Sequence, residues 1–269
     1  MRHAIASGLI LGLLSGCGPN APSLDERYRA AADRGTVWLA ASTVPAGEAE
    51  AALQELTELA THAKGTLVGA QSRVLAGRLL DVLGQRAQAR ETWEPLCRES
   101  YEFREECLMS RIYIARSHEA ERDWEAAERV YDGMGQYHLG APLWFDAPMY
   151  AAEMYGRHGD AQRQRHAYEH AVKVYRERLN MSWSLEQRGH LQHRLAMAYQ
   201  GAGQFDQAAE LLEYLARLDD GVPRPEVLID LARLYEQQHQ PARAAVVVEE
   251  LRRKYLNDPV AQGFLAERS

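Results

Sequence analysis

The most constraining feature of the sequence is one pattern that occurs twice between Leu195 and Leu251. The two copies have the same internal spacing and lie 36 residues apart. The first copy consists of Leu195, Ala196, Tyr199, Ala208, Leu212 and Leu215, and the second of Leu231, Ala232, Tyr235, Ala244, Val248 and Leu251. Self-similarity at a fixed period of this length predicts an array of stacked units rather than one compact core.

The residue types within each copy predict two closely packed helices. The alanines allow the helices to approach each other, and the tyrosines and leucines fill the space around those contacts. This pattern resembles the tetratricopeptide repeat (TPR), a helix-turn-helix unit of about 34 residues. The resemblance implies an all-α fold, a right-handed α-solenoid of about six degenerate TPR-like repeats.

Six units follow from aligning the small residue of each second helix. The aligned positions are Ala49, Ala89, Ala127, Gln164, Ala208 and Ala244, which are 40, 38, 37, 44 and 36 residues apart. Gln164 replaces the small residue in the fourth unit and predicts looser or shifted packing there. We therefore assign residues 24–269 to the solenoid.

Local signals mark the ends of the array and its interruptions. Ser23 and Glu26 form a capping-box pattern before a helix expected from about Leu24 to Ser42, with Gly35 as a point where it can break. Ser184 and Gln187 are placed to cap a later helix. The tail after Pro259 is expected to form a short closing helix, because a solenoid end needs a cover.

The segment between Tyr131 and Pro148 interrupts the repeat rhythm. It mixes glycines with Tyr137, Trp144 and Phe145, and is too apolar for a linker that makes no contacts. We expect a loop that either packs back on the solenoid or meets a partner.

The N-terminus predicts export and lipidation. An apolar stretch follows Arg2 and ends in Leu14-Ser15-Gly16-Cys17, and it is too short for a permanent membrane span. These last four residues resemble the lipobox of bacterial lipoproteins. The resemblance implies a signal peptide at residues 1–16, lipidation of Cys17, and a tether over residues 17–23. The alternative is an ordinary secretory signal that contains a cysteine.

Gly18 then bears on the membrane in which the anchor lies. Enterobacterial lipoproteins retained in the inner membrane carry aspartate after the lipidated cysteine. Gly18 therefore implies the periplasmic face of the bacterial outer membrane. Export also places Cys97 and Cys107 in an oxidising compartment, where they form either a disulfide or two buried apolar cysteines.

Composition and motifs favour binding over catalysis. The formal net charge of −7 and pI of about 5.8 argue against a general nucleic-acid binder. The segment His166-Ala167-Tyr168-Glu169-His170 matches the pattern of inverted zinc proteases, but Tyr168 stands where a repeat expects an inward aromatic residue. We expect a solvated helix face there, no metal, no cofactor and no enzyme. A zinc hydrolase using His166, Glu169 and His170 is the distant alternative.

The repeat resemblance also implies which residues face a partner. The first helix of each unit lines the concave face, and its outward positions mix cations, carboxylates and apolar residues. Such a mixture suits an extended peptide or another envelope protein. The predicted groove residues are Arg78, Asp81, Met109, Arg116, Glu119, Glu153, Arg157, His190, His193, Met197, Arg233 and Glu236.

The predicted function is that of a lipid-anchored periplasmic scaffold or adaptor for another cell-envelope protein. Lipobox and degenerate repeats together resemble the lipoproteins that help assemble outer-membrane barrels and those that pilot secretins for type IV pili. The resemblance covers architecture and does not choose between these two families. A regulator of peptidoglycan enzymes is the alternative.

Overall fold

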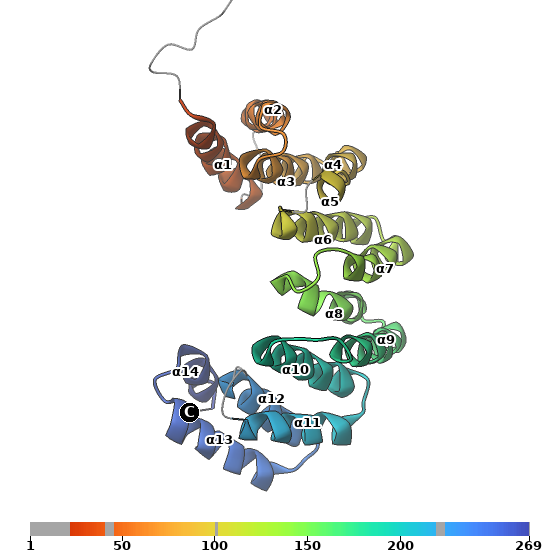
Figure 1. Cartoon of the computed structure of the whole chain (residues 1–269), viewed down its shortest axis with the longest axis vertical. Helices are drawn as coiled ribbons and strands as arrows, with labels where there is room; N and C mark the ends of the chain where they lie inside the picture. The colour runs from red at the N-terminus through yellow and green to blue at the C-terminus, as the bar shows by residue number, and fades with distance from the viewer. Residues whose placement is uncertain (1–21, 41–45, 100–101, 219–223, 269) are drawn as a thin grey trace, which may run out of the picture.

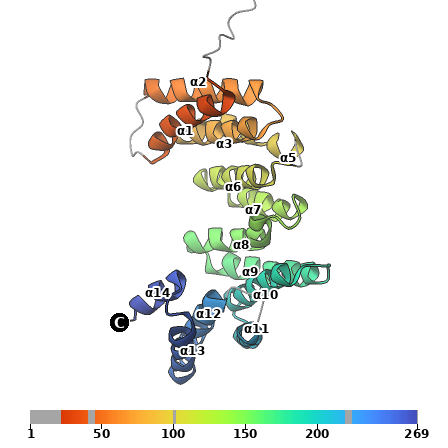
Figure 2. The same cartoon turned by 60° about the vertical axis from the view of Figure 1, so that its left-hand side comes forward.

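The fold is a C-shaped stack of helices. The computed structural model describes residues 22–40, 46–99, 102–218 and 224–268, and every regular element within these ranges is a helix. Figure 1 shows the helices following one another around the C, and the turned view of Figure 2 shows the same order along the long axis. In chain order they are α1 (Leu24–Ala40), α2 (Ala46–His62), α3 (Leu67–Val82), α4 (Arg86–Trp93), α5 (Leu96–Glu99), α6 (Arg104–Ala120), α7 (Trp124–Gly133), the 3₁₀ turn η1 (Met134–Gln136), α8 (Pro142–Arg157), α9 (Ala161–Leu179), α10 (Leu185–Gly201), α11 (Phe205–Arg217), α12 (Arg224–Gln237), α13 (Pro241–Tyr255) and α14 (Pro259–Ala266).

The expected pairs of helices are confirmed. They are α1 with α2, α3 with α4, α6 with α7, α8 with α9, α10 with α11, and α12 with α13. In Figure 1 the first helix of each pair lies on the inner side of the C and the second on its outer side. The chain is therefore an α-solenoid of TPR-like helix pairs with an inner, concave face.

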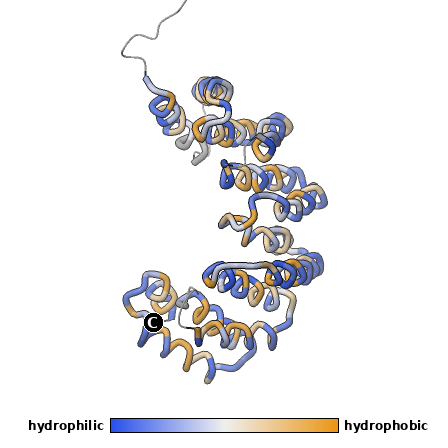
Figure 3. The backbone as a smooth tube through the Cα atoms, in the orientation of Figure 1, coloured by the Kyte–Doolittle hydropathy of each residue, from blue (hydrophilic) through white to orange (hydrophobic). Residues whose placement is uncertain are grey.

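Small residues hold the two helices of a pair together, as the repeat pattern predicts. Ala49, Ala89, Ala127 and Ala208 are fully buried, and Ala244 is nearly so. Hydrophilic and hydrophobic stretches alternate along the helices in Figure 3, as in amphipathic helices that bury one side. The core is thus a continuous series of interfaces between neighbouring helices, rather than one centre.

The capping predictions are confirmed at both helices for which they were made. At α1, Glu26 N donates to Ser23 Oγ over 3.2 Å, and Ser23 N donates to Glu26 Oε2 over 2.7 Å. At α10, Ser184 and Gln187 form the same reciprocal pair, each bond 3.2 Å long. Each pair satisfies two amides that the first turn of a helix leaves without partners.

The break considered at Gly35 does not occur. Helix α1 continues through this residue, which is buried against α3. A Cβ atom on Gly35 would lie 3.4 Å from Leu75 Cδ2. The glycine therefore permits close packing of two helices, and this gain offsets its low helix propensity.

The fourth unit accommodates Gln164 through a glycine on the partner helix. A Cβ atom on Gly156 would lie 2.3 Å from Gln164 Nε2, so glycine at this position leaves room for the amide where it lies. Helices α8 and α9 pack directly against each other. The small residue expected at position 164 is thus supplied from the opposite side of the interface.

The segment after Tyr131 packs back on the solenoid and is more helical than expected. Trp144 and Phe145 belong to the first turns of α8, which begins at Pro142, and Pro148 lies inside this helix. Trp144 is only 2% exposed, and its Nε1 donates to Gly135 O over 3.1 Å. The prediction of a loop reaching to Pro148 is therefore wrong, because proline at the first helical position starts the helix earlier.

A buried arginine fastens this segment to α9. Arg178 is 6% exposed and donates through Nη1 to Trp144 O over 2.7 Å. Its Cζ also lies 3.5 Å from the centre of the Trp144 ring. Burial lowers the pKa of Arg178 to about 10. The interaction fixes the start of α8 and so the inner surface that α8 presents.

Helix α14 closes the C-terminal end. The side chain of Asp258 caps it by accepting from the amides of Val260 and Ala261, and Phe264 is buried. The helix contacts both α12 and α13. Residues 1–21, which include the predicted signal peptide and Cys17, lie outside the described residues.

Candidate functional site: the concave face

The inner surface of the solenoid contains two separate hollow regions. One lies among α8, α10, α12 and α14, and we call it the C-terminal groove. The other lies among α1, α3 and α6, and we call it the N-terminal pocket. Figure 1 shows these two sets of helices at opposite ends of the C.

The C-terminal groove consists of two adjoining hollows of ≈570 Å³ and ≈520 Å³. His190 and Arg194 of α10 line both hollows and so form their common border. Phe145 and Pro142 contribute apolar surface on one side, and Ile229 and Val260 on the other. The groove thus offers charged and apolar groups in alternation along its length.

A hydrogen bond and an ion pair hold side chains of this groove in place. His193 is 8% exposed, and its Nε2 lies 2.8 Å from Asp230 Oδ2, which connects α10 to α12. Arg194 Nε lies 2.6 Å from Asp146 Oδ1, which connects α10 to α8. These side chains are held in place before any partner arrives, and this lowers the entropy cost of binding.

Two further basic residues of the groove are more open. His190 is exposed, with its ring centre 6.5 Å from that of Phe145. Arg233 is also exposed and lies over the Phe264 ring at 5.4 Å. Both can exchange contact with solvent for contact with a partner carboxylate or backbone carbonyl.

Helix α14 forms one wall of the C-terminal groove. Pro259, Val260, Gly263 and Phe264 line the second hollow. Arg268, just after α14, pairs with Glu236 of α12 at 2.8 Å and lies over the Phe264 ring at 3.6 Å. The closing helix therefore does more than cover the last pair of helices, because it also shapes the concave face.

The N-terminal pocket is smaller, at ≈250 Å³. Its lining includes two of the predicted groove residues, Arg78 and Met109. Arg78 lies over the ring of Tyr113 at 5.2 Å. The full lining is Tyr28, Ala32, Gln71, Val74, Leu75, Arg78, Glu105, Glu106, Met109 and Tyr113.

Several predicted groove residues form contacts within the chain instead of lining a hollow. Glu119 accepts from Tyr131 Oη at 2.6 Å and from Arg157 Nη2 at 2.9 Å and 3.0 Å. Burial, followed by the bond to Glu119, raises the pKa of Tyr131. Asp81 lies 3.7 Å from Arg86 Nε, and Glu236 is held by Arg268. These carboxylates join neighbouring helices.

The other three predicted groove residues are Met197, Arg116 and Glu153. Met197 is half-buried and packs against the core around α8 and α10. Arg116 is exposed on α6. Glu153 of α8 is exposed as a whole residue, while its carboxyl is partly desolvated by the groups around it. Burial raises the pKa of Glu153, although the nearby cations Arg157, Arg194 and Arg116 act to lower it.

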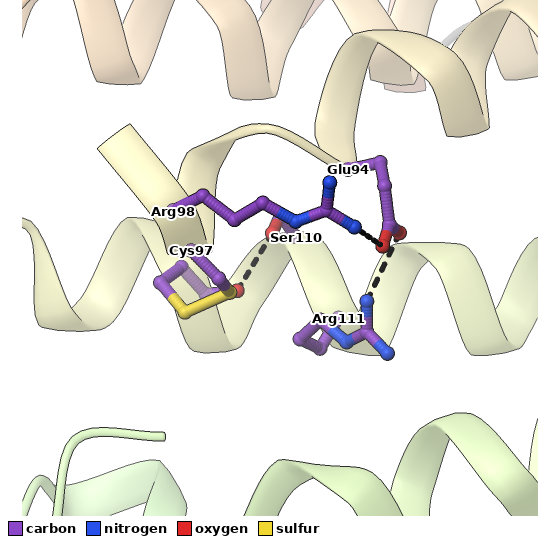
Figure 4. The surroundings of a disulfide bond; sticks show 6 residues. Glu94, Cys97, Arg98, Ser110 and Arg111 are labelled. Carbon is purple, nitrogen blue, oxygen red and sulfur yellow. Dashed lines mark hydrogen bonds and ion pairs between the residues drawn. A yellow bond between two sulfur atoms is a disulfide. The ribbon is translucent and has the colours of Figure 1, made fainter. Parts of the chain in front are cut away.

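A disulfide joins Cys97 of α5 to Cys107 of α6, with their Cα atoms 4.6 Å apart (Figure 4). Beside it, Glu94 binds Arg98 at 3.3 Å and Arg111 at 3.0 Å. The bridge and these ion pairs tie the end of the second unit to the third. None of these residues lines either hollow region of the concave face.

The His-x-x-Glu-His segment lies on α9, with His166 and His170 exposed. His166 Nδ1 lies 3.3 Å from Glu169 Oε2, and His170 Nδ1 lies 3.7 Å from Asp132 Oδ1. The two histidines therefore approach different carboxylates. In the described part of the chain, no three His, Cys, Asp or Glu side chains are grouped so that they can hold a metal ion.

Sequence reasoning did not identify Arg194, Asp146 or the α14 residues as part of the groove. Arg194 follows His193 directly in the sequence. Whether both face inward depends on the superhelical twist between α8 and α10, which the sequence pattern does not give. Asp146 lay in the segment expected to be a loop. The helical pattern after Pro259 was visible, but its position on the inner side depends on how α14 turns back on α12.

Fold and groove define a class: a TPR-like α-solenoid with a concave surface suited to protein–protein interaction. In agreement, residues 199–267 match the family model described as tetratricopeptide repeat. That family is a repeat architecture and not a catalytic domain. A search of curated proteins found no match.

Solved structures with a similar course of the chain include three bacterial proteins. BtubC (BKLC) from P. vanneervenii is 13% identical, with 92% of this chain and 93% of that chain covered and a TM-score of 0.46. PilF from Pseudomonas aeruginosa is 14% identical, with 91% and 99% covered and a TM-score of 0.39. A tetratricopeptide repeat protein from Parabacteroides merdae is 12% identical, with 84% and 78% covered and a TM-score of 0.41.

Proposed function

We propose that the protein is a lipid-anchored periplasmic scaffold whose concave face binds an extended segment of another cell-envelope protein. The observation that carries this proposal is the C-terminal groove. It is open, it runs over successive inner helices, and it presents a fixed hydrogen bond and ion pair beside apolar surface. The partner class that we propose is a component of outer-membrane barrel or secretin assembly.

The chemistry of the groove favours an extended segment over a small molecule. Helices α8, α10 and α12 each contribute side chains to the groove, so a chain lying across them meets each in turn. Polar contacts with His190 and Arg233 set the register of that chain. Apolar contacts with Phe145 and the exposed Val260 supply most of the binding free energy.

Attachment to the membrane rests on the lipobox. None of the described helices is long and apolar enough to cross a membrane. A lipidated Cys17 supplies an anchor without such a helix. Metabolic labelling with an alkyne fatty acid tests this point: the wild-type protein is expected to carry the label in the membrane fraction, and Cys17→Ser is expected to lose it. Equal labelling of both proteins contradicts lipidation at Cys17.

Site-specific photo-crosslinking in the producing cell tests the groove. A photoreactive residue at His190 or Arg233, both exposed in the C-terminal groove, is expected to give the same discrete crosslinked species. The same residue at Arg165 of α9 or Glu210 of α11, both exposed on outer helices, is expected to give none. Crosslinks from the outer positions alone contradict the proposal.

A further inference from the structure

The N-terminal pocket differs from the C-terminal groove in size and in the helices that line it. Its volume of ≈250 Å³ is below the range of about 300 to 1,000 Å³ that is usual for small-molecule sites. It is therefore suited to one side chain rather than to a whole ligand. Its position at the other end of the C makes it independent of the C-terminal groove.

Apolar groups from three helices form the walls of this pocket. Tyr28 comes from α1, Val74 and Leu75 from α3, and Met109 from α6. Leu75 is nearly buried, and the other three are partly exposed. An aliphatic stem that enters the pocket exchanges water for contact on several sides.

The acidic groups of the pocket have no matching cation. Glu105 and Glu106 are adjacent in the first turn of α6. Among the described residues neither carboxylate forms an ion pair, and Glu106 only accepts from Gln71 Nε2 at 3.4 Å. The one cation of the lining, Arg78, lies over the Tyr113 ring.

Electrostatics at this rim favour a positive charge. Burial, followed by repulsion from Glu106, raises the pKa of the Glu105 carboxyl. The positive end of the α6 dipole explains why acids are tolerated there. It does not explain why they border an apolar hollow. An added cation relieves the repulsion between the two carboxylates.

We propose that the N-terminal pocket takes a lysine side chain of a protein partner. The four methylene groups lie against Tyr28, Val74 and Met109, and the ammonium group reaches Glu105 and Glu106. The net charge of −7 adds a general attraction for a basic segment. This site goes beyond the proposed function, because it recognises one residue type and does not depend on the groove.

The probes for this proposal are two blocked amino acids that differ in charge. Nα-acetyl-lysine methylamide carries the ammonium group, and Nα-acetyl-norleucine methylamide has a similar stem without it. Each is titrated into the full chain labelled with ¹³C-methyl methionine. Met109 reports on the pocket, Met181 on a distant exposed position, and Met109→Leu assigns the pocket resonance.

Matched variants then separate local from general charge effects. E105Q/E106Q removes both rim charges. E125Q/E210Q removes two charges from exposed positions on α7 and α11, and Glu125, like Glu105, lies in a first helical turn. Circular dichroism compares the folding of all variants. If the double rim variant is unfolded, E105Q alone takes its place in the comparison.

The lysine probe is expected to shift the Met109 methyl resonance saturably, about five- to tenfold tighter than the norleucine probe, because a charge-assisted contact adds to the apolar one. E105Q/E106Q removes this difference, and E125Q/E210Q keeps it. The proposal is overturned if norleucine binds equally well, if no probe shifts Met109 saturably, or if the rim variant behaves as wild type. Crosslinking at His190 is unaffected by these outcomes.

Discussion

In the interrupted fourth unit, Trp144 is the side chain whose mutation is expected to destabilise the protein most. It is 2% exposed, donates to Gly135 O, and lies under the guanidinium of Arg178. Replacing a buried tryptophan by alanine typically costs about 3 to 5 kcal/mol of unfolding free energy. Trp144→Ala is expected to fall in this range, because the ring contacts with Arg178, Phe145 and Trp183 and one hydrogen bond are lost together.

Trp144→Phe separates these contributions. Phenylalanine keeps an aromatic face for Arg178 but loses the Nε1 donor, and Gly135 O then loses its partner. The expected cost is about 1 to 3 kcal/mol. Trp124→Phe is the control, since Trp124 is half-buried and makes no Nε1 hydrogen bond within the described residues. Its ring centre lies 4.1 Å from that of His158, with the two rings tilted. The cost of Trp124→Phe is expected to be smaller.

Urea unfolding followed by circular dichroism gives the free energies, and amide hydrogen exchange gives their location. A solenoid is stabilised by neighbouring interfaces, so protection is expected to fall first in α8 and α9 and to persist in α12 and α13. The reasoning is refuted if Trp144→Ala unfolds within about 1 kcal/mol of wild type. It is also refuted if Trp124→Phe costs more than Trp144→Phe.

Three other perturbations follow from the structure. The double variant Cys97→Ser/Cys107→Ser removes the disulfide between α5 and α6 and is expected to lower the unfolding free energy by about 3 kcal/mol for a loop of this length. Adding reductant to this variant is expected to cause no further loss. An unchanged urea midpoint contradicts a stabilising disulfide. Burial raises the pKa of Glu153, and a carboxyl whose pKa is raised on folding destabilises the fold above that pKa, so Glu153→Gln is expected to raise the thermal midpoint at pH 7. This gain in the thermal midpoint is expected to shrink towards about pH 4, where Glu153 is protonated in the unfolded chain as well. A gain that grows as the pH falls contradicts the predicted sign. Glu169→Gln on α9 is expected to change stability by less than about 0.5 kcal/mol and to leave crosslinking at His190 intact; loss of crosslinking with normal folding assigns Glu169 a role that the groove does not explain.

The architecture was predictable because it follows from local spacing. Alanine recurs near the start of the second helix in five of the six units and requires a close helix partner, and the six pairs are found where these positions and Gln164 place them. The caps at Ser23 and Ser184 were also readable, since both partners of each cap lie within four residues.

The concave face was less predictable because it depends on contacts between units. Glu119 is 38 residues from Arg157 and has the spacing of a groove residue, yet the two helices approach closely enough for the pair to form. Gly156 compensates for Gln164 across the interface, a relation that repeat alignment does not reveal. The turn of α14 onto α12 likewise depends on Glu236 and Arg268, 32 residues apart.

The measurement that tests the central claim most directly is a structure of the chain with the segment of the partner that crosslinks to His190. The account predicts an extended segment along α8, α10 and α12, in contact with His190 and Arg233 and bordered by α14. A segment bound across the outer helices α9, α11 and α13, with the groove open to solvent, would contradict it.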